Sequence, residues 1–355
     1  MRSFCKTKKH SDPEFENLFR YTSGRWLWDE EQQLRDRCRA FNLVELQNLA
    51  AKAIGSNNCV SITKLAEGGY NKVFRLVLND DKVVLARIPN PNAGPPFYTT
   101  ASEVATMEFA RNFLRIRVPR VLEWNATASN PVGSEYIIME EAAGTPLEKV
   151  WNDMSPDSKL SIMKEVVSME TKMLSISFSH YGGIYFASDA VEGAVPAQIT
   201  TEVPAEFKEQ VSKTFTVGPT TSRDFWNKER SMMNLSRGPR SSPKDCALCS
   251  DDMLVSSAQS SPRAHLQLLE RYLRIAPSLV DIDAPLTRST LWHTDLHSSN
   301  LFVDDSHVTA VIDWQSVWAG PLFLQAQPSP LVDYQGSILL QRPDNFDNLD
   351  PKYQA

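Results

Sequence analysis

The sequence predicts an α+β protein with an antiparallel sheet in its first part and a mainly helical second part. Strand-like runs rich in Val, Ile and Leu lie before residue 142, separated by short polar turns and one helical segment. After Gly144-Thr145-Pro146, apolar side chains recur at helical spacing instead. A chain of 355 residues, 42% hydrophobic and 23% charged, is long enough to build two lobes of this kind.

The elements of the first part follow from local patterns. A helix is expected where Leu46, Leu49 and Ala53 recur at helical spacing and Gly55 follows as a stop. A polar turn at 79–81 joins two of the strand-like runs as a hairpin. The expected elements, in order, are a helix at Leu43–Ile54, strands at Val60–Ala66, Val73–Leu78 and Val83–Ile88, a helix at Thr100–Leu114, and strands at Val118–Leu122 and Tyr136–Met139.

The second part begins with a clear helix signal. Ser155-Pro156 places Pro at the first helical position, and an apolar stripe then runs to Leu174. A stretch rich in Pro, Ser and charged residues at about 187–250 predicts a long-looped but partly ordered insertion, and a helical pattern resumes at Ala264–Leu273. We therefore expect an N-terminal extension at 1–40, an N-lobe at 41–142 and a C-lobe at 143–355 that contains the insertion.

Charge and composition exclude several classes of function. With 37 basic and 43 acidic residues the net charge is −6, so the chain has no basic excess for binding nucleic acid. No run approaches the ~18 apolar residues that a transmembrane segment needs. The first 13 residues are basic and polar with no apolar core, which excludes a secretory signal and only faintly resembles a mitochondrial presequence. Cys246-x-x-Cys249 has no second pair to complete a zinc site, and two reduced thiols in a loop are the favoured interpretation.

Three oxygen-bearing side chains are predicted to meet near the end of the chain. Residues 301–303 and 308–312 flank a polar turn and should pair as an antiparallel hairpin. This pairing brings Asn300 near Asp313, and the loop that carries Asp295 can reach the same point. Carboxylate and amide oxygens suit Mg²⁺ that also binds phosphate oxygens. Separately, each residue could be an ordinary turn or strand-end residue; their joint spacing favours a site.

This spacing resembles a known family. His293-Thr-Asp295-Leu-His297-x-x-Asn300, followed by Ile312-Asp313-Trp314, is similar to the aminoglycoside phosphotransferase branch of the protein-kinase-like phosphotransferases. The resemblance implies a two-lobe protein-kinase-like fold. It also implies that Asp295 accepts the substrate hydroxyl proton, while Asn300 and Asp313 hold Mg²⁺ on the phosphates of ATP. His297 is interpreted as a packing or hydrogen-bonding residue of the same loop.

The resemblance also gives meaning to two backbone segments of the first part. Gly68, Gly69 and Asn71 lie between two expected strands, where a turn that covers phosphates would sit, although a Gly-Gly hairpin turn alone is common. Glu140 to Ala142 follows a buried strand, where backbone groups would bind adenine between the lobes.

One position departs from the family pattern. The strand at 83–88 presents Arg87 where the family has a Lys that contacts the α- and β-phosphates. Arg keeps the charge and can bind phosphate in a bidentate manner. Glu103, in the following helix, takes the place of the Glu that pairs with that cation in the family. The alternative interpretation is that Arg87 and Glu103 form an exposed ion pair of little energetic value.

Other segments resemble the fungal "altered inheritance of mitochondria" type-nine proteins, which are phosphotransferase-like, mitochondrial and without a well-defined substrate. These segments are residues 21–27, Val217-Gly218-Pro219, Phe225-Trp226 and Asp313-Trp314-Gln315 with Pro321-Leu322. That similarity favours a mitochondrial location, with the cytoplasm as the alternative. Only 42 residues follow Asp313, which favours a truncated gene model or a naturally short form.

The function predicted from the resemblance is ATP- and Mg²⁺-dependent transfer of the γ-phosphoryl group to a hydroxyl of a small molecule. A nucleotide-binding pseudoenzyme or scaffold is the alternative, and Arg87 modestly favours it. A protein kinase is disfavoured because no Ala-Pro-Glu-like signature follows Asp313. The substrate and any protein partners are not predicted, because pockets on this fold share no general code.

Overall fold

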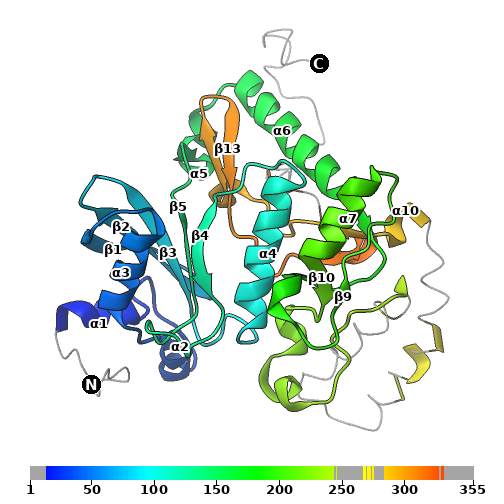
Figure 1. Ribbon diagram of the computed structural model, residues 1–355, viewed down its shortest axis with the longest axis horizontal. Coiled ribbons are helices and arrows are strands. Elements are labelled where there is room, and N and C mark those ends of the chain that lie inside the picture. Colours follow the sequence, from blue (N-terminus) through cyan, green and yellow to red (C-terminus); the bar gives the residue numbers. More distant parts are fainter. Residues whose placement is uncertain are drawn as a thin grey trace, which may run out of the picture.

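The computed structural model describes residues 13–243, 284–327 and 329–331, together with isolated positions between 245 and 275. Figure 1 shows the N-lobe in blue and cyan beside a C-lobe in green and orange. Half of the helix predicted at Ala264–Leu273, and the pair Cys246 and Cys249, lie outside the described residues.

The N-lobe is built on a five-stranded sheet with the order β1-β2-β3-β5-β4, in which every neighbouring pair is antiparallel. Four of the five predicted strands lie close to their predicted bounds. The fifth, β4, begins at Val121 rather than Val118, because Pro119 has no N–H to donate to a sheet. The strands are β1 Cys59–Glu67, β2 Asn71–Leu78, β3 Val83–Pro89, β4 Val121–Asn125 and β5 Tyr136–Glu140.

The helix α3 (Leu43–Ala53) covers one face of this sheet, and the helix α4 (Tyr98–Asn112) packs beside β4 and β5 on the side of the C-lobe (Figure 1). The Asn42 side chain caps α3 by accepting a hydrogen bond from the Glu45 N–H. Alternate residues of β3 point to opposite faces. Ala86 accordingly packs in one core cluster with residues of α3, whereas Arg87 faces Glu103 of α4.

The N-terminal extension runs along the outer side of the N-lobe. It contains the short helices α1 (Pro13–Phe19) and α2 (Glu30–Asp36), and α2 buries no residue. Phe19 and Phe41 are anchored in the core cluster beneath α3, with ring centroids 5.0 Å apart.

The C-lobe combines helices with three small antiparallel sheets. Its longest described helix, α6 (Pro156–Leu174), begins as predicted after Ser155, whose hydroxyl accepts a hydrogen bond from Ser158 N–H. The sheets have the orders β8-β10-β9, β14-β11-β7 and β13-β12-β6. Their strands are β6 Thr145–Pro146, β7 Ser177–Phe178, β8 Gly183–Phe186, β9 Val195–Pro196, β10 Phe215–Gly218, β11 Ser289–Leu291, β12 Leu301–Asp304, β13 His307–Val311 and β14 Ala319–Pro321.

Shorter helices complete the described C-lobe: α5 Leu147–Val150, α7 Ala205–Thr214, α10 Ala284–Thr287 and α11 Leu322–Gln325. Short 3-10 helices lie at Trp151–Asp153, Ala187–Asp189, Arg223–Phe225, Lys228–Met232 and Ser298–Asn300. Part of the segment predicted as an insertion enters the lobe core, because Val211, Phe215 and Val217 are fully buried there. The prediction of an α+β protein with a two-lobe kinase-like arrangement is confirmed by the antiparallel N-lobe sheet, α4 and the hairpin that follows them.

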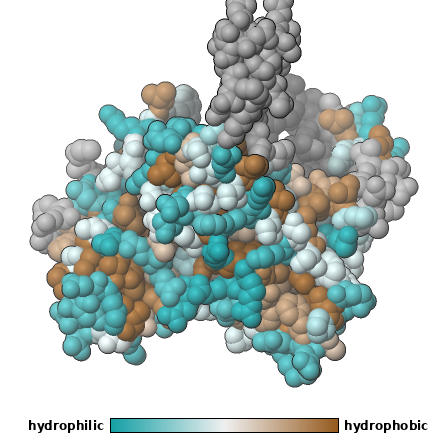
Figure 2. Space-filling view, turned by 90° about the horizontal axis from the view of Figure 1, so that it is seen from above, coloured by the Kyte–Doolittle hydropathy of each residue, from teal (hydrophilic) through white to brown (hydrophobic). Residues whose placement is uncertain are grey.

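The face of the molecule shown in Figure 2 is dominated by polar residues, with smaller apolar patches between them. Among the described residues, no helix is both long enough and apolar enough to cross a membrane.

Candidate active site

The predicted hairpin sets the position of two site residues. β12 and β13 pair with Leu301 opposite Val311, and Ile312 N–H donates to the Asn300 carbonyl at 3.0 Å. Asn300 therefore precedes one strand at the same end at which Asp313 follows the other. The backbone of these two residues is held side by side by the sheet itself.

The loop before the hairpin brings the third residue to this end. Asn300 Nδ2 donates to the Asp295 backbone carbonyl at 2.9 Å and lies 3.3 Å from its carboxylate Oδ2. His297 Nε2 lies 3.4 Å from Asp295 Oδ1. The side chain of Asp295 is 62% exposed, so its carboxylate is open to a ligand. The structure thus brings the Asn300 side chain into contact with Asp295, and it places Asp313 next to the residue that pairs with Asn300 through the backbone.

Asp313 has a special backbone conformation. Its φ is +61°, in the left-handed region, which Asp tolerates better than most residues. Its neighbours fix it: Trp314 is buried against the His293 ring, and His293 Nε2 lies 3.1 Å from the Ile312 carbonyl. Burial lowers the pKa of His293, so this ring is a neutral packing and hydrogen-bonding group. Asp313 itself keeps a side chain that is 42% exposed.

Arg87 and Glu103 form a buried ion pair between β3 and α4, with side chains 7% and 3% exposed. Arg87 Nη2 also lies 3.2 Å from Asp313 Oδ1. Burial lowers the pKa of Arg87, and the nearby charge of Asp313 opposes that shift. The Arg87 guanidinium therefore points toward the end of the β12–β13 hairpin at which Asp313 lies.

Gly68 and Gly69 form the turn between β1 and β2. Gly68 N–H donates to the Asn71 carbonyl at 2.9 Å, which closes the turn. A side chain at Gly68 would meet nothing within 4 Å, and one at Gly69 would meet only the Arg37 side chain at 3.9 Å. The fold does not require glycine at either position, so the open space beside the turn is available to a ligand.

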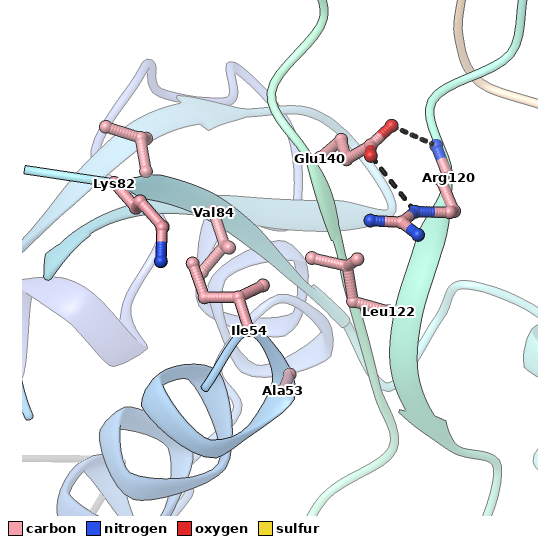
Figure 3. A pocket seen from close by; sticks show the side chains of 8 residues that line it. Ala53, Ile54, Lys82, Val84, Arg120, Leu122 and Glu140 are labelled. Atoms are coloured by element: carbon pink, nitrogen blue, oxygen red, sulfur yellow. Dashed lines mark hydrogen bonds and ion pairs between the residues drawn. The ribbon is translucent and has the colours of Figure 1, made fainter. Parts of the chain in front are cut away.

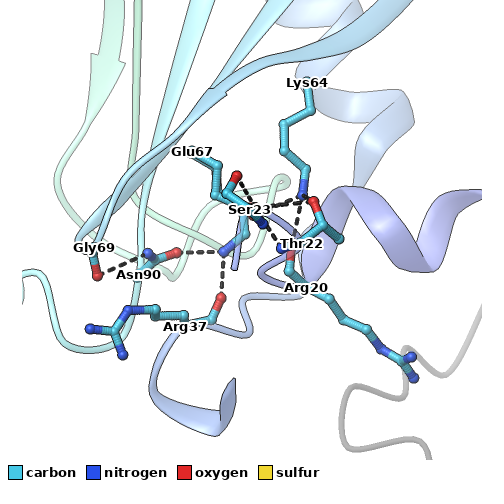
Figure 4. A network of polar contacts seen from close by, with 9 residues as sticks. Arg20, Thr22, Ser23, Arg37, Lys64, Glu67, Gly69 and Asn90 are labelled. Carbon is cyan, nitrogen blue, oxygen red and sulfur yellow. Dashed lines mark hydrogen bonds and ion pairs between the residues drawn. The ribbon is translucent and has the colours of Figure 1, made fainter. Parts of the chain in front are cut away.

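The N-terminal extension forms hydrogen bonds to Glu67, the residue directly before this turn (Figure 4). The Glu67 carboxylate Oε2 accepts hydrogen bonds from the backbone N–H groups of Thr22 and Ser23, at 2.6 and 3.1 Å. Both hydroxyls donate to the same oxygen, and Lys64 Nζ lies 2.7 Å from Oε1. The last residue of β1 is thereby tied to a segment 45 positions away in sequence.

A buried lysine follows the turn. Lys72 is fully buried and donates to the Arg37 carbonyl and to Asn90 Oδ1. Asn90 N–H in turn donates to the Tyr70 carbonyl at 2.7 Å, which links Lys72 to the tip of the turn. Burial lowers the pKa of Lys72 to about 8. Lys72 and Arg87 lie on opposite faces of the sheet, so this lysine points to the buried face that packs against α3 and does not replace the missing family Lys.

The predicted adenine-binding segment lies at the end of β5. The Glu140 carboxylate is turned toward Arg120, with Oε1 3.0 Å from Nε (Figure 3). This pair lines a pocket of about 420 Å³ together with residues of α3, β3 and β4. Within the described part of the chain, Ala142 makes no backbone hydrogen bond outside the helices and strands.

Sequence reasoning missed Gln315 and Lys72 as parts of this site. Gln315 contacts both Arg87 and Asn71, and its only sequence signal is its place directly after Asp313-Trp314. Lys72 was unremarkable as a strand residue. Lys72 is on the same face of β2 as the buried residues Phe74 and Leu76, and this two-residue spacing was the signal that could have identified a buried cation.

The residues present suit Mg²⁺ bound together with phosphates rather than a metal caged by protein alone. No group of three or more His, Cys, Asp or Glu side chains in the described residues could hold a metal ion. Mg²⁺ commonly uses one or two carboxylates and completes its shell with phosphate oxygens and water. The half-exposed Asp313, with Asn300 beside it on the hairpin, offers that donor set.

Part of the chain is similar to a known protein family. The family model described as "Phosphotransferase enzyme family" matches residues 241–323, which include the whole hairpin and the loop before it. This part of the chain is therefore similar to the phosphotransferase enzyme family, as its motifs predicted.

Several relatives are similar to most of this chain. A subtelomeric hrmA-associated cluster protein of Aspergillus fumigatus is 32% identical over 82% of this chain and 65% of its own length. The mitochondrial protein named altered inheritance of mitochondria protein 9 is 28% identical in Yarrowia lipolytica, over 99% of this chain and 67% of that protein. In Lachancea thermotolerans it is 26% identical, over 94% and 67%. The chain thus spans about two thirds of the length of these relatives. The predicted resemblance to the type-nine proteins is confirmed.

Solved structures with similar folds include aminoglycoside phosphotransferases. The apo form of a thermostable mutant of APH(4)-Ia has 15% identity and a TM-score of 0.42, over 79% of this chain and 74% of that chain. The streptomycin–ATP complex of APH(2″)-IIa has 13% identity and a TM-score of 0.41, over 79% and 73%.

Proposed function

We propose that the protein is an ATP- and Mg²⁺-dependent phosphotransferase that moves the γ-phosphoryl group to a hydroxyl of a small molecule. The observation that carries the proposal is the meeting of Asp295, Asn300 and Asp313 at one end of the hairpin, with Arg87 reaching Asp313 from the N-lobe. The phosphotransferase family match over 241–323 supports it.

Each side chain has a task that its surroundings permit. Asp295 is exposed and anionic, so it can accept the acceptor hydroxyl proton, a contribution of ~10²–10⁴ in rate. Asn300 and Asp313 would hold Mg²⁺, which neutralises charge on the transferring phosphoryl group. Arg87, positioned by Glu103, would bind the phosphates beneath the turn of Gly68, Gly69 and Asn71, and the backbone from Glu140 to Ala142 would bind adenine.

The direct test is ATP turnover against a library of hydroxyl compounds. Asp295→Asn is expected to lower turnover by ~10²–10⁴ while nucleotide binding and the unfolding midpoint stay unchanged. The matched control is Asp305→Asn, because Asp305 lies in the exposed turn of the same hairpin and Asn tolerates its φ of +51°. Unchanged turnover in Asp295→Asn would refute the role of the base.

A nucleotide-binding scaffold is the second candidate, and Arg87 in place of the family Lys is the observation that favours it. Thermal-shift titration with Mg-ATP beside the turnover assay separates the two. Binding without turnover on any acceptor identifies the scaffold, whereas binding with turnover identifies the enzyme.

We also propose a mitochondrial location, since the relatives named altered inheritance of mitochondria protein 9 carry that address. A fluorescent fusion of the full-length chain, imaged against a mitochondrial marker, tests it. Cytosolic fluorescence would contradict it.

A further inference from the structure

Gln315 joins the C-lobe to three separate parts of the N-lobe. Its Oε1 accepts hydrogen bonds from Asn71 Nδ2 and from Arg87 Nη2, each at 2.6 Å. Its Nε2 donates to the Ala93 carbonyl at 2.7 Å. Asn71 begins β2, Arg87 lies on β3, and Ala93 lies in the loop between β3 and α4. Both the oxygen and the nitrogen of the Gln315 side-chain amide therefore form hydrogen bonds between the lobes.

The two groups that meet at Oε1 are donors that a phosphate oxygen would also attract. Arg87 is the predicted phosphate-binding cation, and Asn71 closes the predicted phosphate-covering turn. Gln315 also stands two positions after the predicted metal ligand Asp313. Its amide oxygen therefore holds together the N-lobe donors that must act on the same phosphates.

The contact depends on the shape of arginine. One terminal nitrogen of Arg87 pairs with Glu103, and the other reaches both Asp313 and Gln315. A lysine has a single terminal nitrogen on a flexible stem and lacks this rigid fork. A buried arginine without enough acceptors would also leave polar hydrogens unsatisfied. Gln315 supplies the acceptor that the family Lys would not need.

We propose that Gln315 is a positioning residue that makes Arg87 a working substitute for the family lysine. It orients the guanidinium and the Asn71 amide toward the nucleotide phosphates, and it thereby sets the affinity for Mg-nucleotide. This inference rests on the proposed function. The rival explanation is an ordinary tie between the lobes, which would act equally with Lys or Arg at position 87.

A double-mutant cycle distinguishes the two explanations. The variants are Gln315→Leu, Arg87→Lys and their combination, and the readout is binding of Mg-ADP by titration calorimetry. Gln315→Leu alone is expected to weaken binding about tenfold, since a hydrogen bond to a charged group is lost. On the Arg87→Lys background the same change is expected to weaken binding less than about threefold.

Controls separate positioning from damage to the fold. Gln198→Leu makes the same replacement at an exposed residue of the C-lobe and should bind as wild type. If Gln315→Leu does not fold, Gln315→Asn keeps the amide but shortens its reach, and the same cycle applies.

The outcomes are distinct. Equal losses on the wild-type and Arg87→Lys backgrounds would overturn the inference in favour of a general lobe tie. Tight binding by Gln315→Leu in a protein whose wild type turns over ATP would overturn this inference alone. Failure of the wild type to bind Mg-ADP would overturn both this inference and the proposed function.

Discussion

Arg87 and Glu103 form an ion pair that is almost completely buried between β3 and α4, with side chains 7% and 3% exposed. Burial of two charges is costly, and only their mutual attraction and further hydrogen bonds offset it. Arg87 gains those further bonds from Asp313 and Gln315, both of the C-lobe. The Arg87–Glu103 pair therefore connects the stability of the N-lobe to the position of Asp313 and Gln315 in the C-lobe.

Removal of one partner should destabilise the protein strongly. Glu103→Ala leaves the Arg87 charge buried without its main partner, so the free energy of unfolding is expected to fall by about 3–5 kcal/mol in urea denaturation. The control is Glu141→Ala, which removes the carboxylate of the half-exposed pair with Arg75 and should cost less than about 1 kcal/mol. Equal losses in the two variants would show that burial of the Arg87 pair has no energetic weight.

The parts of the site that were predictable from sequence are those encoded locally. Asp295 and Asn300 lie five positions apart, and the hairpin that brings Asp313 beside them is a short pattern of two apolar runs around a polar turn. The N-lobe strands and α3 and α4 were predictable for the same reason, since their periodicity and turn residues are local. Val118–Leu122 shows the limit, because the strand pattern was apolar but Pro119 displaced its start.

The rest depends on contacts between distant segments. Gln315 meets Asn71 across 244 positions and Arg87 across 228, and no local pattern marks such a partner. Thr22 reaches Glu67 across 45 positions through backbone and hydroxyl groups that many sequences could supply. Tertiary packing alone decides these pairings, so they emerge only from the three-dimensional structure.

Asp313→Asn should separate metal binding from folding. Asn tolerates the φ of +61° and keeps a side-chain oxygen that can accept from Arg87, so the unfolding midpoint should fall less than in Glu103→Ala. The loss of a carboxylate ligand should weaken Mg²⁺-dependent binding of ADP tenfold or more, on the order of 1.4 kcal/mol. Titration of Mg²⁺ at fixed ADP measures this. An unchanged Mg²⁺ requirement would show that Asp313 is not a metal ligand.

Gly68→Ala should leave stability intact and still affect nucleotide binding. No atom lies within 4 Å of the added Cβ, so the free energy of unfolding should stay within about 0.5 kcal/mol of wild type. A methyl group beside backbone N–H groups would keep phosphate oxygens from approaching closely, so binding of Mg-ADP should weaken. Gly133→Ala is the contrasting control: its added Cβ also meets no atom, but its φ of +74° predicts lower stability with unchanged binding. Normal binding by Gly68→Ala would place the phosphates elsewhere.

Lys72 should give the protein a distinctive alkaline stability profile. Burial lowers its pKa to about 8, below the value of 10.5 for an ordinary lysine. Between these two pH values the unfolded chain binds more protons than the folded one, so this residue makes stability rise with pH. Below about pH 8 both states are protonated, and above 10.5 both are neutral, so its contribution to the slope vanishes on either side.

The comparison with Lys72→Met isolates this residue from other groups that titrate in alkali. The free energy of unfolding of wild type minus that of Lys72→Met should increase by about 3 kcal/mol between about pH 7.5 and pH 10.5, on the order of the shift converted at 1.36 kcal/mol per pH unit. Urea denaturation of both proteins at matched ionic strength measures the difference at each pH. Parallel curves would mean that the Lys72 ammonium is as well solvated in the folded protein as in the unfolded chain. A rising difference would confirm that burial keeps the pKa of Lys72 in the folded protein well below that of an ordinary lysine.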